Sequence, residues 1–286
     1  MATDISQRIR HLYPTLSKGH KKIATIVLRD SNKAAYSTAL RLARLADVSE
    51  STVIRFAGVL GYDGYSEFQH AIQELVKSNM TLNQRIEITK KRLGQGDILQ
   101  NVIESDIKKI KDTLDYLDRD TFKSAVDAIL RAKRIYVMGA RSAECLARLF
   151  SYNLSLIFDN VIFIQPSSAS EVFEQLFSVN KQDLVIAFSF PRYSTKIMNA
   201  AKFSRKKSAE VLAFTDSTNS PLADYANYLI TAESDMASFM DSLVAPLSIL
   251  NAMIVEITRR KEKDLRSRFD SLEKIWDEYE VYTKRK

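Results

Sequence analysis

Five short apolar runs in the last two thirds of the chain constrain the fold more than any other feature. They alternate with stretches of helical periodicity at 142–157, 194–207 and 220–225. The runs are RIYVMG (134–139), VIFI (161–164), DLVIAFSF (183–190), EVLAF (210–214) and NYLIT (227–231). Strands that alternate with helices in this way form a parallel sheet with helices on both faces. The sequence therefore predicts an α/β domain with a five-stranded parallel sheet, followed by a long helical segment from about Ser242.

The first third of the chain shows a different pattern, because its apolar residues recur only at helical spacing. Helical stretches are expected at 20–29, 40–46, 49–60 and 66–76. A polar segment of mixed charge follows and is broken near Gly94-Gln95-Gly96. We therefore expect an α + α/β protein, with an all-helical domain at 1–77, a partly helical linker at 78–106 and the α/β domain at 107–286.

The stretch from Thr38 to Leu60 fits a helix-turn-helix. Its second helix repeats apolar residues at i, i+3, i+4 and i+7, namely Val53, Phe56, Ala57 and Leu60. Ser49 precedes this helix and can accept its first amide protons as an N-cap. At 100° per residue, the opposite face presents Ser51, Arg55 and Gly58. The exposed face thus has a small polar N-terminal end and one guanidinium group.

A helix-turn-helix places its second helix in the major groove of DNA, with the N-terminal residues at base edges. Serine and threonine can bond to bases or phosphates, and arginine favours guanine. The candidate DNA-binding residues are Ser49, Glu50, Ser51, Thr52 and Arg55. The turn carries Asp47 where this motif usually has glycine, and aspartate tolerates left-handed backbone angles better than most residues. A plain αα-hairpin in a helical bundle is the alternative interpretation.

The charge distribution indicates a polyanionic partner for the first domain. The chain carries a net charge of +7, and residues 1–80 contribute +4 with 11 basic and 7 acidic side chains. A single cysteine, Cys145, excludes a disulfide framework and a multi-cysteine zinc site, so we expect no metal and no cofactor. No apolar run reaches the roughly 18 residues that span a bilayer, and the N-terminus lacks the apolar region of a secretory signal. We therefore expect a cytoplasmic protein without a membrane partner.

Polar loops follow three of the predicted strands, at the edge where parallel sheets bind ligands. Gly139 to Ser142 follow the first strand, Ser189 to Thr195 the third, and Thr215 to Ser217 the fourth. Hydroxyl and amide groups at a helix N-terminus can bind a phosphate group. The second of these loops is the most informative, because it combines several hydroxyls with Arg192. The alternative is that these serines and threonines only cap helices.

The run TALRLARLADVSESTVIRFAGVLGYDGYSEFQ (38–69) resembles the helix-turn-helix of the RpiR family of bacterial transcription regulators, and its tail GYDGYSEFQ is typical of that family. The second half of the chain resembles the family's sugar isomerase (SIS) domain, an α/β/α sandwich. The resemblance implies that Ser142, Ser189, Ser194 and Thr195 bind a phosphorylated sugar, with Arg192 and Tyr193 belonging to the regulators' variant of the third-strand loop. The usual G-x-G-x-S turn has Arg141 in place of its second glycine.

The expected function is that of a sequence-specific DNA-binding transcription regulator of sugar metabolism, modulated by a phosphorylated sugar in the SIS domain. Such a protein reads an inverted-repeat operator in double-stranded DNA as a homodimer or homotetramer. All three histidines lie in the first domain, so we expect no catalytic residues and no enzyme activity. The alternatives are a sugar-phosphate isomerase, or related SIS-domain enzyme, with an N-terminal helical extension, and a non-specific basic DNA-binding protein.

Overall fold

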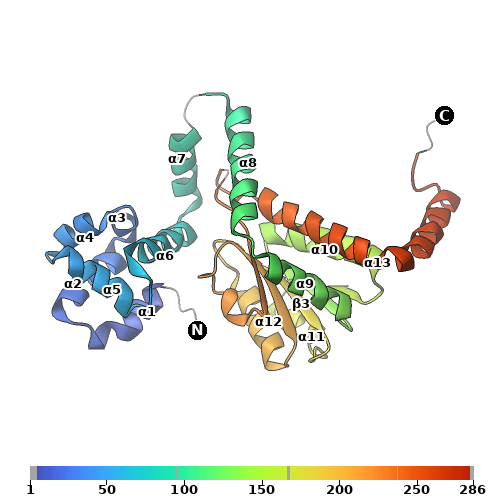
Figure 1. The fold of residues 1–286 in the computed structure, drawn as a ribbon, viewed down its shortest axis with the longest axis horizontal. Helices are drawn as coiled ribbons and strands as arrows, with labels where there is room; N and C mark the ends of the chain where they lie inside the picture. Colours follow the sequence, from blue (N-terminus) through green and yellow to red (C-terminus); the bar gives the residue numbers. More distant parts are fainter. Residues whose placement is uncertain (1–4, 94–95, 166–167, 237, 284–286) are drawn as a thin grey trace.

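A computed structural model describes residues 5–93, 96–165, 168–236 and 238–283 of the chain. Figure 1 shows an all-helical part on one side and an α/β part on the other, with helices α7 and α8 between them. This arrangement confirms the predicted fold class of a helical N-terminus followed by an α/β domain with a five-stranded parallel sheet.

The helical part packs six helices around one apolar core. They are α1 (Ile5–Leu12), α2 (Lys18–Arg29), α3 (Ser31–Ala35), α4 (Ala39–Ala46), α5 (Glu50–Val59) and α6 (Gly64–Asn79). Phe56 and Phe68 lie at the centre of this core, both fully buried and in edge-to-face contact with ring centroids 5.6 Å apart. Side chains at helical spacing thus meet as the sequence pattern predicts, which fixes α5 against α2, α4 and α6.

Two further helices occupy the segment for which the sequence predicts a linker. Helix α7 spans Leu82–Leu93 and helix α8 spans Ile98–Tyr116, while residues 94 and 95 of the expected break lie outside the described residues. Helix α7 is not a free spacer, because Arg85 and Thr89 are buried and bond to the segment after the last strand of the sheet. The connection between the two parts is therefore also a contact between them.

The sheet has the strand order β2-β1-β3-β4-β5, and all its pairs are parallel. The strands are β1 (Ile135–Gly139), β2 (Val161–Phe163), β3 (Leu184–Phe188), β4 (Glu210–Thr215) and β5 (Tyr228–Thr231). All five coincide with the predicted apolar runs to within a few residues. The order reverses between β1 and β3, so the switch point where such sheets bind ligands lies at the carboxyl ends of these two strands.

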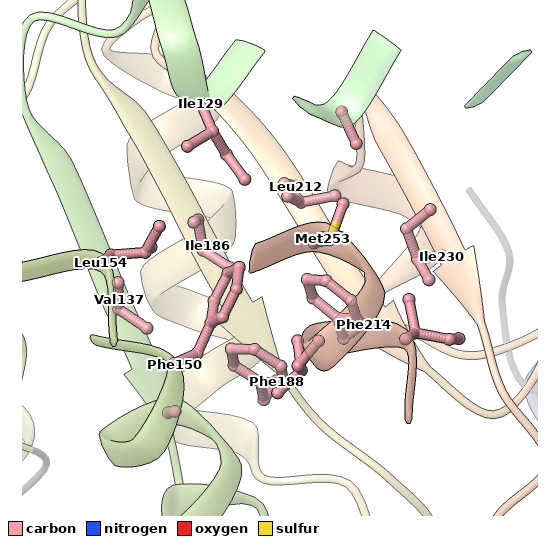
Figure 2. Packing of buried hydrophobic residues seen from close by; sticks show 14 of the residues in the cluster. Ile129, Val137, Phe150, Leu154, Ile186, Phe188, Leu212, Phe214, Ile230 and Met253 are labelled. Carbon is pink, nitrogen blue, oxygen red and sulfur yellow. The ribbon is translucent and has the colours of Figure 1, made fainter. Parts of the chain in front are cut away.

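Helices cover both faces of the sheet, as parallel strands require. Helices α9 (Arg119–Arg131), α10 (Ser142–Ile157) and α13 (Val244–Glu278) pack on one face, and α11 (Ala169–Gln175) and α12 (Thr195–Lys206) on the other. Figure 2 shows the first of these cores, in which Phe188 stacks on Phe214 with centroids 4.6 Å apart and Phe150 meets both edge-on. These rings anchor α10 over the strands that carry the polar loops.

Two of the short helices differ from the sequence prediction. The helix expected at 220–225 is a single 3-10 turn, η2 (Ala223–Tyr225), since the Ser220 hydroxyl accepts a bond from the amide of Leu222 and holds a tight turn there. Helix α11 was not predicted, because its seven residues are too few for a helical period to stand out. Neither difference changes the sheet.

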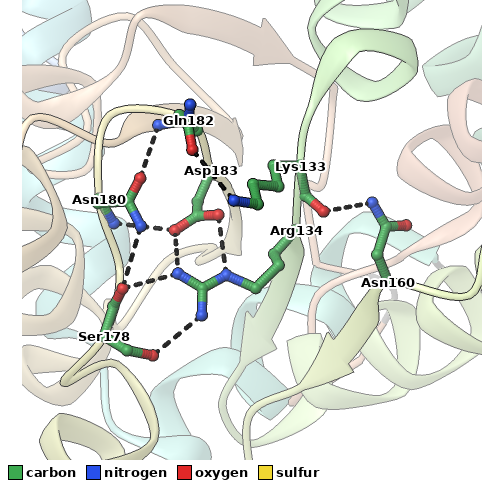
Figure 3. A network of polar contacts seen from close by, with 7 residues as sticks. All are labelled: Lys133, Arg134, Asn160, Ser178, Asn180, Gln182 and Asp183. Atoms are coloured by element: carbon green, nitrogen blue, oxygen red, sulfur yellow. Dashed lines mark hydrogen bonds and ion pairs between the residues drawn. The ribbon is translucent and has the colours of Figure 1, made fainter.

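A polar network ties the amino ends of the central strands together, at the edge opposite the polar loops. Arg134 donates to both carboxylate oxygens of Asp183, at 3.0 and 2.7 Å, and to the carbonyl of Ser178 at 2.7 Å (Figure 3). The Asp183 side chain is fully buried, and the amide of Asn180 also donates to it at 2.9 Å. This network holds the start of β1 beside the start of β3, so both strands end level at Gly139 and Phe188.

Candidate functional site

The turn between α4 and α5 has the geometry of a helix-turn-helix. Asp47 ends α4 in the left-handed conformation, with φ 51° and ψ 58°, as expected for this substitute for glycine. The amide of Val48 donates to the carbonyl of Ala43 at 3.0 Å and closes the turn. Lys22 of α2 bonds to the Asp47 carboxylate at 2.7 Å, and this bond with its charge lowers the pKa of Asp47.

Hydroxyl groups gather at the N-terminus of α5. Ser49 caps the helix by accepting from the amide of Thr52 at 3.3 Å, and its hydroxyl also lies 2.9 Å from that of Ser51 and 2.8 Å from that of Thr52. Arg55 is exposed and its Nε donates to the carbonyl of Ser51 at 3.2 Å. Together with exposed Glu50, the five predicted residues form one continuous polar surface at the start of a helix.

Two features of this surface come from outside the predicted set. Ile54 projects from α5 beside Arg55 and is 47% exposed, which provides an apolar group of the kind that contacts thymine methyls. The N-terminus of α2 lies against that of α5, because a Cβ built on Gly19 would be 3.3 Å from Cγ2 of Thr52. Two helix N-termini therefore meet at one edge, an arrangement that favours phosphate groups. Only the tertiary packing of α2 reveals this pairing.

The polar loops after β1 and β3 line one cleft at the switch point of the sheet. Ser142, Ser189, Arg192 and Ser194 are all among its lining residues, whereas Thr195 is not. Ser189 is buried and its hydroxyl accepts from the amide of Ser194 at 3.4 Å. Four of the five side chains predicted to bind a ligand are thus brought together from two loops that are almost 50 residues apart in the sequence.

Both helices that start at this cleft lack a side-chain cap. The side chains of the N-cap residues, Arg141 of α10 and Ser194 of α12, make no capping hydrogen bond to the first turn of their helices. The alternative role considered for Ser194, capping of α12 by its hydroxyl, is therefore not seen in the structure. Arg141 and Arg192 both have positive φ, 60° and 63°, which is rare for arginine and typical of strained functional loops. Two amide-rich helix ends and two strained arginines surround a space suited to an anion.

Gly139 accounts for how closely α10 approaches β1. A Cβ at this position would lie 2.7 Å from the carbonyl oxygen of Ala143 and 3.0 Å from Cβ of Ala147. No other residue type fits here without moving the helix. The single glycine beyond residue 97 thus sets the position of Ser142 at the cleft, while Arg141 adopts the conformation for which the resemblance would place a second glycine.

Other lining residues of this cleft come from parts of the chain outside the predicted site. Leu82 and Arg85 of α7 line it, as do Phe239, Met240 and Asp241 from the segment after β5. Arg85 donates through Nη1 to Asp241 at 2.8 Å, with only 2% and 9% of these two side chains exposed. Sequence patterns do not indicate this pair, because its partners are 156 residues apart and neither lies in a motif.

The third polar loop is used internally. Tyr193 donates to both carboxylate oxygens of Asp216, at 2.9 and 3.1 Å, and Thr215 donates to the same carboxylate at 3.1 Å. Burial and the nearby carboxylate of Glu74 raise the pKa of Asp216 to about 7. These bonds fix the β3 loop to the β4 loop, which holds the strained segment around Arg192 in place.

A second cleft lies beside the first and joins the two parts of the chain. Its lining includes His70, Glu74 and Lys77 of α6 together with Asp216 and Glu233 of the α/β part. His70 of the helical domain therefore does reach the α/β domain. It lines this second cleft, whereas Ser142, Ser189 and Ser194 line the first. Within the described ranges, no group of three His, Cys, Asp or Glu side chains is arranged to hold a metal ion. The helices of the same residues include none with the length and apolarity to cross a bilayer.

Comparison with known proteins identifies a domain in each part of the chain. Residues 3–79 match the helix-turn-helix domain of the rpiR family, and residues 128–256 match the SIS domain. The HTH-type transcriptional regulator HexR of Escherichia coli is 25% identical over 96% of this chain and 92% of its own length. Among solved structures, the Vibrio vulnificus NanR protein complexed with ManNAc-6P has a TM-score of 0.61, with 20% identity over 96% of this chain and 98% of that one.

The sugar isomerase domain of an RpiR transcription factor from Sphaerobacter thermophilus has the same fold as the second part, with a TM-score of 0.58 and 22% identity over 60% of this chain and 96% of that one. A helix-turn-helix joined to a SIS domain defines a class of DNA-binding transcription regulators of sugar metabolism, and the protein is one of them. Within this class the chain belongs to the RpiR family.

Proposed function

We propose that the protein binds an inverted-repeat operator through helix α5 and that a phosphorylated sugar in the cleft between the β1 and β3 loops modulates this binding. The ligand part of this proposal is supported by one observation: Ser142, Ser189, Arg192 and Ser194 line the same cleft, at which helices α10 and α12 begin. Thr195 begins α12 and contributes to this N-terminus from outside the lining. The NanR relative, which has the same fold, is complexed with ManNAc-6P.

In this proposal Ser49, Glu50, Ser51, Thr52 and Arg55 face the major groove. Their support is the polar N-terminus of α5, which stands free of the core while Val53 and Phe56 anchor the helix from behind. The adjoining N-terminus of α2 would meet the DNA backbone. We infer a cytoplasmic location, since both an operator and phosphorylated sugars are reached there.

A two-fold operator requires a two-fold protein, and an apolar surface supports a dimer. Helix α8 exposes a row of apolar side chains at helical spacing: Ile103 (50%), Ile107 (47%), Ile110 (37%) and Leu114 (53%). Val255 of α13, 67% exposed, belongs to the same groove as Ile110 and Leu114. We place a second copy of the chain on this surface, since an apolar row of this length is seldom left in water.

The first test is a selection of bound sequences from random duplex DNA near physiological salt, with and without a pool of hexose, pentose and amino-sugar phosphates. The proposal expects an inverted repeat and a difference between the two arms. Recovery of no common sequence in either arm would contradict the operator half. Affinity that is equal for all sequences and falls steeply with salt would instead identify non-specific binding.

The second test uses the variant Ser194→Ala with Thr195→Ala. We expect it to bind the operator like the wild type and to lose the response to the sugar phosphate. Ser155→Ala is the matched control, because this hydroxyl is exposed near the end of α10 and bonds only within its own helix. A response that survives in the double variant would place the phosphate group elsewhere.

The protein is proposed to act as a sensor and not as an isomerase, which needs an acid/base pair beside the bound sugar. Among the described residues that line the cleft, one has a carboxylate, Asp241, and it accepts a hydrogen bond from Arg85. A steady-state assay with ketose and aldose phosphates checks this. Turnover that is lost on replacing Glu233 or Glu171 would favour the enzyme.

A further inference from the structure

Arg85 is a buried cation at the ligand cleft that the α/β domain does not itself supply. It lies on α7, directly after the helical domain, and only 2% of the residue is exposed. Its Nη1 donates to Asp241 at 2.8 Å and its Nη2 to the carbonyl of Lys77 at 3.2 Å. Its Nε is buried and finds no hydrogen-bond partner among the described residues. The same side chain lines the cleft that contains Ser142, Ser189 and Ser194.

This pairing leaves the guanidinium incompletely satisfied. A buried donor without a partner is destabilising, and arginine binds anions best when two parallel N–H groups meet two oxygens. Asp241 accepts one hydrogen bond from Nη1 of Arg85 and leaves Nε without a partner among the described residues. Burial raises the pKa of Asp241 even though the charge of Arg85 opposes this shift. The carboxylate is therefore a poorly solvated counter-ion that a better anion can replace.

We infer that Arg85 is a further ligand-binding residue, whose guanidinium exchanges the carboxylate of Asp241 for the phosphate group of the bound sugar. This inference rests on the proposed function of the same cleft. A phosphate group presents three terminal oxygens, so it can meet Nε and a second N–H of Arg85 together. The helix N-termini of α10 and α12 contact the same anion from the opposite wall.

The exchange would also carry the signal to the DNA-binding domain. The segment that bears Asp241 holds the helical part through three contacts: Lys77 pairs with Asp235 at 3.4 Å, Thr89 donates to the carbonyl of Ser238 at 3.0 Å, and Met236 packs into the helical domain's core. The Arg85–Asp241 ion pair is a fourth contact between this segment and α7, and the release of Asp241 removes it. Ligand binding thereby favours a different position of α7 relative to this segment. Regulation requires such a difference in contacts between the free and the ligand-bound states.

The test is isothermal titration of the full-length protein with inorganic phosphate and with a series of hexose and pentose phosphates. Arg85→Gln is expected to weaken binding about tenfold or more. Asp241→Asn is expected to tighten binding several-fold, because it removes the competing carboxylate. Lys90→Gln is the matched control, since Lys90 is an exposed cation on the same helix. Circular dichroism of each variant verifies folding, and Asp241→Asn decides the outcome by itself if Arg85→Gln does not fold.

The expected changes in affinity have opposite signs in Arg85→Gln and Asp241→Asn. A purely structural role of the pair predicts instead that both variants weaken binding alike. Arg85→Gln with wild-type affinity, or Asp241→Asn with weakened affinity, overturns the inference. If these results occur while Ser194→Ala with Thr195→Ala still weakens binding, the proposed function stands and the role of Arg85 falls. If the wild type binds none of the probes, the proposed function fails and the inference fails with it.

Discussion

Single residues decide the geometry of both sites through backbone conformations that most side chains avoid. Asp47 holds the left-handed turn of the helix-turn-helix, and Lys22 bonds to its carboxylate. Arg141 and Arg192 hold positive φ angles at the cleft between the β1 and β3 loops, where Gly139 lets α10 approach. Each of these positions orients a helix N-terminus, so the conformation of one residue sets where an anion can bind.

Arg55 offers the sharpest test of DNA recognition at this scale. Arg55→Ala should weaken operator binding by about 1–3 kcal/mol and relax specificity at one base pair. This is the free energy by which a bidentate arginine–guanine contact discriminates against other bases. Fluorescence anisotropy with operator variants measures both effects. Arg41→Ala, which removes an exposed cation from α4, is the control and should affect all sequences equally. An unchanged operator affinity in Arg55→Ala would show that α5 is not the reading helix.

The raised pKa of Asp216 predicts that the stability of the protein depends on pH. Burial and Glu74 raise its pKa from 3.8 to about 7, so the folded state binds more protons than the unfolded state between these values. The free energy of unfolding should therefore decrease as the pH rises from about 4 to about 7. Above that range the stabilisation by protonated Asp216 is lost and the pH no longer changes it. Urea denaturation from pH 5 to pH 8 measures the slope.

Asp216→Asn removes the titrating group and should flatten this slope, whereas Asp115→Asn, at an exposed site on α8, should leave it unchanged. Equal slopes for Asp216→Asn and the wild type would mean that Asp216 ionises normally in the folded protein.

At the scale of elements, the strands and the long helices follow their sequence patterns, whereas the short helices do not. The five strands and helices such as α10 and α12 lie where the apolar periods predict them. Helix α11 and the turn η2 depend instead on single caps and hydroxyls, such as Ser168 and Ser220, which many loops share. A helical period needs several turns to be recognised, so the prediction fails first where helices are short.

The exposed row of α8 gives the prediction that belongs to this scale. Ile107→Glu with Leu114→Glu should raise the dimer dissociation constant by at least about 100-fold, because an unpaired charge in an apolar interface costs several kcal/mol. Light scattering after size-exclusion chromatography measures the mass. Lys108→Glu places the same carboxylate elsewhere on α8 and should leave the mass unchanged. If both variants have the mass of the wild type, the second copy does not sit on α8.

At the scale of the whole molecule, the segment after β5 connects the two clefts and the two domains. Asp235 and Met236 contact the helical domain, while Phe239, Met240 and Asp241 line the cleft between the β1 and β3 loops. The isolated bridge between Met236 and Asp241 joins the two sets of contacts. These contacts provide a direct physical connection between the two clefts, which is the condition for coupling between the domains.

Met236→Ala should therefore reduce the effect of the sugar phosphate on operator affinity more than it reduces the affinity for either ligand. Its side chain is 4% exposed in the helical domain's core, so truncation should also lower stability by about 2 kcal/mol or more. Operator titrations with and without the effector measure the coupling. Met198→Ala, on α12 at the other face of the sheet, controls for lost packing and should retain the response. A full response in Met236→Ala would show that this contact does not carry the coupling.

The sequence by itself determined the elements and the candidate residues within them. Helical periods, the Ser49 cap and the strand runs are local, since each is encoded by neighbouring residues that share one face. The tertiary structure alone decided which loops meet, that Thr195 stays outside the cleft lining and that Arg85 faces Asp241 across 156 residues. Such contacts leave no periodic trace in the chain, because they arise from how finished elements pack and where buried charges must find partners.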